Sequence, residues 1–444
     1  MSDATTGGTS AGTTGGMMNA TGRPGAAGPP GVDLASRWLG GGVVAASDES
    51  FGFKENLLVP EAADFTPGRY DHRGEIVDGW ETRRRRGDPG HDWAIVRLGV
   101  PGVITGVDVD TSFFTGNYPP YCRVEACGLE GYPGPDELAA AAWAEIVPTS
   151  PLKGDGHNLF AVSDPHRFTH VRLSIDPDGG VARLRIHGEP VPDPRHWDGV
   201  TVDLASQEEG GRVVDSSGGF YTSAELLNRP DRARTMGEGW ETARRRDDGH
   251  DFAVIRLAAA GRVRRIEIDT SHFKYNASAE VALYGHPGQD GASGHPGQDG
   301  ASGHPGQDGA SGRLGQDGAP PATGPGWVPL LPRTRIRPDT RHVFTLREPG
   351  EAVTAVRLDA FPDGGISRVR LVGTVEPRAR LRAGLRWFGA LPAGQAAACL
   401  ADAGLSSADI ARTVAARPLT EDFPASLPEG GAWDVLRAWI AGAP

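Results

Sequence analysis

Cysteine is scarce in this chain of 444 residues, which has only Cys122, Cys127 and Cys399. So few thiols are typical of a protein in the reducing cytoplasm, and they exclude a small domain held together by disulfides. No second Cys/His pair of zinc-site spacing lies near Cys122 and Cys127, so the sequence does not predict a structural zinc site. We therefore expect a cytoplasmic protein with domains large enough to build their own cores.

Long apolar runs and an excess of positive charge are also missing. No run of about 18 apolar residues, the length that spans a membrane as a helix, occurs. The N-terminal 31 residues lack the charged start and apolar stretch of a secretory signal, and we expect a disordered leader there. Lys and Arg number 45 against 57 Asp and Glu, a formal net charge of -12, so nucleic acid is not an expected partner.

What the chain does contain is an internal repeat. "DGWETRRRRGDPGHDWAIVRLG" begins at Asp78, and "EGWETARRRDDGHDFAVIRLA" begins at Glu238. The match continues upstream, in two segments that both begin "VDLAS", and downstream into two segments that share "DTS". We therefore expect a tandem duplication, with one unit at 32–190 and the other at 200–376, each with a core of its own.

Each unit has the residue period of β-strands. Val107 and Val109, like Ile266 and Ile268, lie two positions apart, as one buried face of a sheet requires. Short strands, frequent Gly and Pro, and turns with the sequence PDGG predict an all-β fold. The pattern resembles the discoidin-type, galactose-binding-like jelly roll, so we expect two tandem jelly-roll β-sandwiches with ligand loops at one end of each.

Two further segments depart from this pattern. Residues 285–324 form a ten-residue repeat of small and polar residues, which predicts a low-complexity insert in the second unit. Residues 378–444 are rich in Ala and Leu at helical spacing, with a capping box from Ser406 to Asp409, and predict a small helical extension. The extension resembles the opening of the ureidoimidazoline decarboxylase family. The later histidine motif of that family is missing, so we predict no decarboxylase activity.

The repeated motifs resemble the allantoicase family. They are Trp-Glu-Thr-x-Arg-Arg-Arg, His-Asp-aromatic and Asp-Thr-Ser-x-Phe-x-x-Asn, together with "SDE" at Ser47 and "KENLL" at Lys54. The resemblance covers nearly all of residues 32–376, in the family's order. It implies two β-sandwich repeats and a hydrolase of purine degradation, which converts allantoate and water to ureidoglycolate and urea.

That reaction sets requirements for the site. Allantoate carries one carboxylate and two ureido groups on one carbon, so an arginine fork suits the carboxylate and Asn or Asp suits the ureido ends. A general acid must protonate the leaving nitrogen, and a base must activate water or deprotonate the remaining ureido group. No Ser or Cys nucleophile and no organic cofactor is required. Residue spacing shows no tight His/carboxylate triad, so the participation of a divalent metal is left open.

The candidate catalytic groups are three residues of the first unit and their counterparts in the second: His91, Asp92, Asp110, His250, Asp251 and Asp269. We expect Asp92 or Asp110 to orient the imidazole of His91 and to raise its pKa. The alternatives are structural, since Asp92 can cap a turn and Asp110 can simply end a strand.

The candidate substrate-binding residues come from the same motifs. They are Glu81, Arg84, Arg85 and Asn117 in the first unit and Glu241, Arg244, Arg245, His272, Lys274 and Asn276 in the second. A structural alternative exists here too, because Glu81 and Glu241 precede arginines and can form ion pairs with them.

The two copies differ at several positions of the loop after the Asp-Thr-Ser motif. Phe113 is replaced by His272, Thr115 by Lys274 and Gly116 by Tyr275, so a composite site or one working site is expected rather than two equal ones.

A tandem jelly-roll module that binds a sugar or another small polar ligand without catalysis is the alternative function. An inactive family member, favoured only by Tyr275, is a third. The sequence leaves metal dependence and self-association into a homo-oligomer open.

Overall fold

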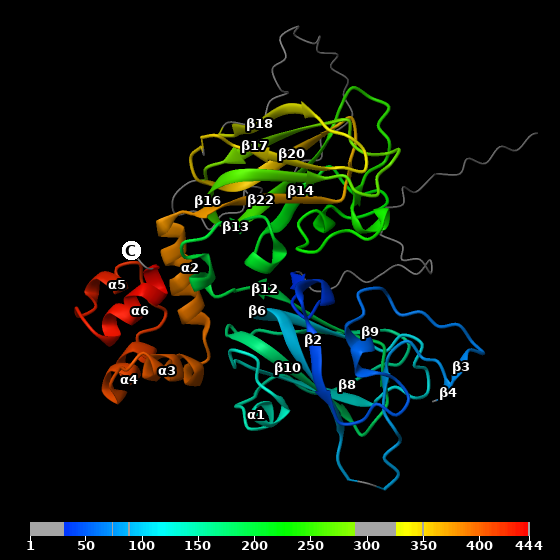
Figure 1. Cartoon of the computed structure of the whole chain (residues 1–444). Coiled ribbons are helices and arrows are strands. Elements are labelled where there is room, and N and C mark those ends of the chain that lie inside the picture. Colours follow the sequence, from blue (N-terminus) through cyan, green and yellow to red (C-terminus); the bar gives the residue numbers. More distant parts are fainter. Residues whose placement is uncertain (1–30, 73, 88, 289–325, 349, 443–444) are drawn as a thin grey trace, which may run out of the picture.

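The structure is a computed structural model that describes residues 31–442, apart from 73, 88, 289–325 and 349. The expected leader and most of the low-complexity insert lie outside the described residues. Figure 1 shows the two repeats as neighbouring β-rich domains, with the C-terminal helices beside them. None of the helices in the described part of the chain is both long and apolar enough to cross a membrane.

Repeat 1 is organised around one long strand, β6 (Asp92–Asp110). Its residues 92–97 pair with β10, and 94–97 also with β2. Residues 102–110 pair with β12, the first two of them also with β10, and 106–110 also with β9. β6 therefore bends between the two layers of a sandwich and belongs to both. The other strands are β1 (Val32–Asp33), β2 (Gly42–Ala46), β3 (Tyr70–Asp71), β4 (Gly74–Glu75), β5 (Trp80–Glu81), β7 (Tyr121–Cys127), β8 (Ala144–Pro151), β9 (His157–Ala161), β10 (Arg167–Asp176), β11 (Gly180–Val181) and β12 (Arg183–Pro190).

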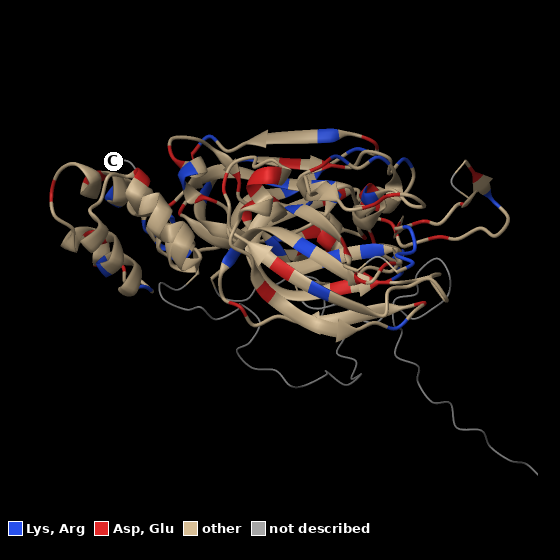
Figure 2. Cartoon of the chain, turned by 90° about the horizontal axis from the view of Figure 1, so that it is seen from below, with Lys and Arg blue, Asp and Glu red and all other residues tan. Residues whose placement is uncertain are grey.

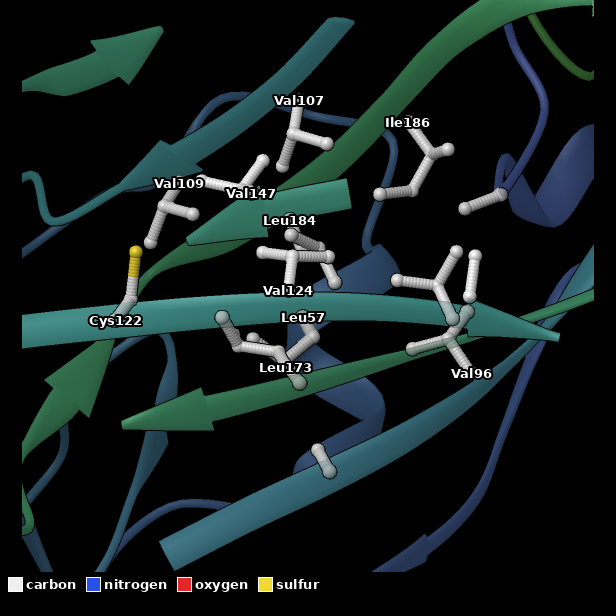
Figure 3. Close-up of a cluster of buried hydrophobic side chains, with 14 of the residues drawn as sticks. Leu57, Val96, Val107, Val109, Cys122, Val124, Val147, Leu173, Leu184 and Ile186 are labelled. Carbon is white, nitrogen blue, oxygen red and sulfur yellow. The ribbon is translucent and has the colours of Figure 1, made fainter. Parts of the chain in front are cut away.

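The core of repeat 1 fills the space between these layers. Val96 from the first half of β6 and Val107 and Val109 from its second half belong to one buried cluster, together with Leu173 of β10 (Figure 3). Side chains alternate along a strand, so Asp108 and Asp110 lie on the opposite, outer side of their layer. The bend places both ends of β6, Asp92 and Asp110, at the same end of the sandwich.

Repeat 2 has the same topology. Its strand order β13-β22-β16-β20-β17-β18 matches β1-β12-β6-β10-β7-β8 of repeat 1. The prediction of two tandem all-β jelly rolls is therefore confirmed. The strands are β13 (Val202–Asp203), β14 (Arg212–Ser216), β15 (Trp240–Glu241), β16 (Asp251–Asp269), β17 (Glu280–His286), β18 (Val328–Arg335), β19 (Arg341–Thr345), β20 (Val353–Phe361), β21 (Gly365–Ile366) and β22 (Arg368–Val375).

Two short strand pairs bring the Trp-Glu-Thr motif against the PDGG turn. β5 pairs with β11 in repeat 1, and β15 pairs with β21 in repeat 2. Glycine is required in the turn because of close approach: a Cβ atom on Gly180 would lie 1.9 Å from the ring of Phe114, and one on Gly365 would lie 1.9 Å from the carbonyl oxygen of Asn276. In each repeat, the Trp-Glu-Thr motif, the arginines that follow it and the PDGG turn lie at one end of the sandwich. We call this region the loop end of the repeat.

The C-terminal extension forms the predicted helices, and α4 begins directly after Ser406, whose hydroxyl accepts a hydrogen bond from the backbone N–H of Asp409. Trp387 and Phe388 of α2 are buried in a separate apolar cluster, which Val103 of repeat 1 also contacts. The helices are α2 (Pro377–Ala390), α3 (Ala393–Asp402), α4 (Ser407–Ala415), α5 (Phe423–Ser426) and α6 (Ala432–Ala441), and repeat 1 has the short helix α1 (Pro135–Ala139). Short 3-10 turns are η1 (Arg37–Leu39), η2 (Lys54–Leu58), η3 (Pro194–Trp197), η4 (Gln207–Glu209), η5 (Ala224–Leu226) and η6 (Met236–Glu238).

Candidate active site at the loop ends

The start of β6 is tied to the arginine-rich loop. Oδ1 of the buried Asp92 accepts hydrogen bonds from Oγ of Ser47 at 2.9 Å and from Nε and Nη2 of Arg85 at 3.1 and 2.8 Å. Repeat 2 makes the corresponding contacts among Asp251, Ser217 and Arg245. Arg85 therefore already binds one carboxylate, and this pair holds the loop in place.

A carboxylic acid and an amide meet at each loop end. Nδ2 of Asn117 donates a hydrogen bond of 2.7 Å to Oε1 of Glu81, and Asn276 donates in the same way to Glu241. Burial raises the pKa of Glu81, and the hydrogen bond from Asn117 and the charge of Arg84 oppose that rise. A half-buried acid whose pKa is raised keeps its proton to a higher pH than a free glutamic acid, which suits a proton donor.

Arg84 is the arginine of repeat 1 best placed to meet a ligand. Its Nη1 lies 3.1 Å from Oδ1 of Asp178, its Nη2 donates to the carbonyl oxygen of Gly116 at 3.2 Å, and its side chain is 49% exposed. The counterpart Arg244 is exposed, and none of the described residues forms an ion pair with it. Arg84 is thus held in position but keeps part of its guanidinium accessible.

The two predicted catalytic histidines differ in their surroundings. His91 is exposed, and neither Asp92 nor Asp110 is hydrogen-bonded to it among the described contacts, contrary to our expectation. His250 instead stacks on Phe361 with ring centroids 4.5 Å apart, and its Nε2 lies 3.3 Å from Oδ2 of Asp359. The reason is in β20, where Asp359 and Phe361 occupy the positions of Ser174 and Asp176 in β10.

The end of β6 shapes the loop that carries Asn117. Oδ1 of Asp110 accepts hydrogen bonds from both the backbone N–H and the hydroxyl of Ser112, at 2.8 and 2.6 Å. Phe113 follows with φ of 68°, a left-handed conformation that is unfavourable for a bulky residue, and Asp155 accepts its backbone N–H at 2.9 Å. Repeat 2 repeats these features with Asp269, Ser271, His272 at φ of 73°, and Asp339.

The remaining predicted binding residues lie in this loop of repeat 2. Nε2 of His272 lies 2.9 Å from the carbonyl oxygen of Ala233, so its ring is engaged by the protein itself. Lys274 and Tyr275 are exposed, and Tyr275 is almost fully so. The loop of repeat 2 therefore presents a cation and an aromatic ring where repeat 1 has Thr115 and Gly116.

The family model described as the allantoicase repeat matches residues 32–191 and 202–376. The chain belongs to the allantoicase family. A probable allantoicase of Nocardia farcinica is 48% identical over 342 residues, 77% of this chain and 93% of that protein, and one of Streptomyces coelicolor is 45% identical over 366 residues, 79% and 88%. The crystal structure of allantoicase from Saccharomyces cerevisiae matches with a TM-score of 0.60 at 32% identity, covering 77% of this chain and 92% of that one.

Sequence reasoning missed one recurrent acid in this member of the allantoicase family. Asp178, in the PDGG turn, is 3% exposed and accepts a hydrogen bond from the backbone N–H of Arg85 at 2.7 Å, and Asp363 accepts from the backbone N–H of Arg245 at 3.1 Å. The turn was recognised only as a turn. The available signal was that the PDGG turn, with its aspartate, occurs in both copies.

Across the described residues, no group of three or more His, Cys, Asp or Glu side chains is arranged to hold a metal ion. All three cysteines are unpaired, and burial raises the pKa of Cys122 and of Cys127 to about 12. These two thiols are therefore part of the core rather than of a nucleophilic site.

Proposed function

We propose that this protein is an allantoicase that works at its loop ends. It hydrolyses allantoate to ureidoglycolate and urea, the activity of the family to which it belongs. The observation that supports this location is the recurrence of one set of contacts in both repeats: a Glu–Asn pair, an Arg–Asp–Ser cluster and an Asp in the PDGG turn. Figure 2 shows Lys and Arg interspersed with Asp and Glu along the chain.

The substrate is bound by side chains that can form further hydrogen bonds. Arg84 binds the carboxylate, because its side chain is 49% exposed although it contacts Asp178, whereas the side chain of Arg85 is 23% exposed and binds Asp92 through two nitrogens. Asn117 and Glu81 bind a ureido group, which offers both N–H donors and a carbonyl acceptor. Asp92, Asp110 and Asp178 act as positioning residues that hold the loops carrying these side chains.

Two groups exchange protons with the reactants. Glu81, in its protonated form, which burial favours, gives its proton to the leaving ureido nitrogen, so that the C–N bond breaks and urea departs. His91 takes a proton from the attacking water, whose oxygen becomes the hydroxyl of ureidoglycolate. The next proton exchange with solvent restores both groups, and the sum is allantoate plus water giving ureidoglycolate plus urea.

Repeat 2 supports the reaction less directly. Glu241, Asn276, Arg244 and Lys274 offer a binding surface like that of repeat 1, and Asp251, Asp269 and Arg245 hold its loops. His250, however, lies against Phe361 and Asp359. We therefore place the chemical step in repeat 1, with repeat 2 as a site of weaker or no turnover.

The decisive test is release of urea from allantoate by the purified protein. Urea formation at a rate proportional to protein supports the proposal, and allantoate binding without urea would favour a non-catalytic jelly-roll module. The same assay after dialysis against a chelator, with and without added divalent metal, answers the question of metal dependence. We place the reaction in the cytoplasm, since the three cysteines are unpaired.

A further inference from the structure

A cavity of about 800 Å³ lies between the two repeats; at one side it reaches Asp110, Ser112 and Phe113, but the Glu81–Asn117 pair is not part of its lining. On the side of repeat 1 it is lined by the outer face of one layer, with Asp108 of β6, His157 of β9 and Arg185 of β12. On the side of repeat 2 it is lined by residues after η5, including Asn228 and Arg229. Clefts between domains with a few polar groups are common places for small ligands.

One wall of the cavity carries a carboxylate with an unused oxygen. Oδ2 of Asp108 lies 2.8 Å from Nδ1 of His157, and Asp108 is only 6% exposed. Its Oδ1 is buried and has no hydrogen-bond partner among the described residues. A buried carboxylate oxygen without a donor is unfavourable, so this position favours a ligand that donates an N–H.

The same cavity also offers positive charge. The hydrogen bond with Asp108 raises the pKa of His157, which is partly exposed and therefore available to a ligand. Arg185 donates through Nη2 to the carbonyl oxygens of Val59 and Pro60, its Nε lies 3.9 Å from Oδ2 of Asp33, and it lines the cavity. Cationic donors and an N–H acceptor thus face one small space.

Repeat 2 lacks this arrangement at the matching positions. Glu267 and Arg341 stand where repeat 1 has Asp108 and His157, as the strand registers show. The longer Glu267 carboxylate is occupied on both oxygens, by Arg341 at 2.6 Å and by Arg265 at 3.2 Å. The substitution of a shorter acid and a histidine leaves room and an unused acceptor in repeat 1 only.

We propose that the cavity between the repeats is a second binding site for a small ureido acid; it adjoins the loop after Asp110 but does not include Glu81, Arg84, His91 or Asn117. The carboxylate of this ligand faces Arg185 and His157, and its urea-type N–H donates to Oδ1 of Asp108. The choice of ligand rests on the proposed function, because allantoate and ureidoglycolate both carry these two groups. A ligand here contacts both repeats beside the point where Arg229 lies over the ring of Trp38, with Cζ 3.2 Å from its centroid.

Hydantoate, which has one carboxylate and one ureido group and no second ureido group to lose, is the probe. We expect equilibrium dialysis of the full chain to give one bound hydantoate more for the wild type than for Asp108→Asn. The matched control Glu267→Gln keeps the wild-type number. His157→Gln, which retains a donor for Asp108 but cannot take up a proton, should weaken this site about tenfold, the loss expected for one charge-assisted contact.

Urea release distinguishes this proposal from the proposed function. Asp108→Asn should release urea from allantoate at the wild-type rate, because the Asp108 side chain is bonded to His157 and takes no part in the hydrogen bonds of Glu81, Asn117 or Asp110. An unchanged number of bound hydantoate molecules in Asp108→Asn, or equally tight binding of acetate or urea at this site, would overturn the second site. Loss of urea release in Asp108→Asn would also overturn it, by moving the chemistry into the cavity. A wild-type protein that binds hydantoate here but releases no urea would refute only the proposed function.

Discussion

Asn117 donates a 2.7 Å hydrogen bond to Glu81, although the two residues are 36 positions apart in the chain. The contact fixes one oxygen of an acid whose pKa is raised by burial. Glu241 and Asn276 form the same pair in repeat 2. This repeated pair is the basis of the first prediction.

Glu81→Gln should lower kcat for urea release on the order of a hundredfold, the usual loss when a general acid is removed. The amide keeps the size of the side chain, so the melting temperature should stay close to that of the wild type. Glu241→Gln is the matched control, and we expect a smaller loss from it. Near-normal turnover in Glu81→Gln would show that another group is the general acid.

His91→Asn and His250→Asn should separate catalysis from stability. His91 is exposed, so its replacement should lower kcat on the order of a hundredfold with no change in melting temperature. His250 stacks on Phe361, and its loss should cost about 1 kcal/mol of unfolding free energy while kcat stays largely intact. Equal losses of kcat in the two variants would show instead that both repeats catalyse.

Neighbouring arginines should behave differently when replaced by alanine. Arg84→Ala should raise KM more than it lowers kcat, because a carboxylate contact exists in both the ground state and the transition state. Arg85→Ala leaves Asp92 buried without its cation, which should reduce the unfolding free energy by about 3 kcal/mol. Steady-state kinetics and denaturant titration of the two variants check both statements, and a stable Arg85→Ala protein with only a raised KM would contradict them.

Acid should destabilise the protein through His170. Burial, with a smaller contribution from Arg97, lowers the pKa of this histidine to about 4, and its Nε2 has no partner among the described residues. The unfolded chain takes up this proton near pH 6.5, so stability is complete above that pH and falls as the pH drops towards 4, by about 3 kcal/mol.

Repeat 2 indicates the control variant for this effect. Ala355 occupies the position of His170 in repeat 2, opposite Arg256 where repeat 1 has Arg97. Denaturant unfolding of His170→Ala between pH 7.5 and 4.5 should show a weaker pH dependence than the wild type. If the unfolding free energy of both proteins changed equally with pH, a group other than His170 would cause the acid sensitivity.

Truncation before Arg378 should destabilise the protein without stopping the reaction. The C-terminal helices cover Val103 and Val191 and bind Asp198 through Arg380 at 2.7 Å. Val103 lies at the bend of β6, at the opposite end of the sandwich from Asp92 and Asp110. We expect a lower melting temperature with kcat/KM for allantoate retained at a temperature where the truncated protein is folded. A folded truncation that releases no urea would show that the helices contribute to the site.

The sequence by itself determined the duplication, the all-β fold and the helical extension. Alternating apolar residues such as Val107 and Val109 can bury one face of a strand only in a sheet, and two copies of one pattern must build two cores. The loop motifs could also be located from sequence, because each repeat carries its Glu, Arg, His and Asn in the same order.

Only the tertiary structure decided what these residues contact. Arg84 and Arg85 are adjacent in sequence, yet one binds Asp178 and the other Asp92, because successive side chains of an extended segment point in different directions. His91 and His250 occupy matching positions but differ because residues of β20, far along the chain, fill the space beside His250. The cavity at Asp108 was likewise beyond sequence reasoning, since it forms only where the outer face of one repeat meets the other.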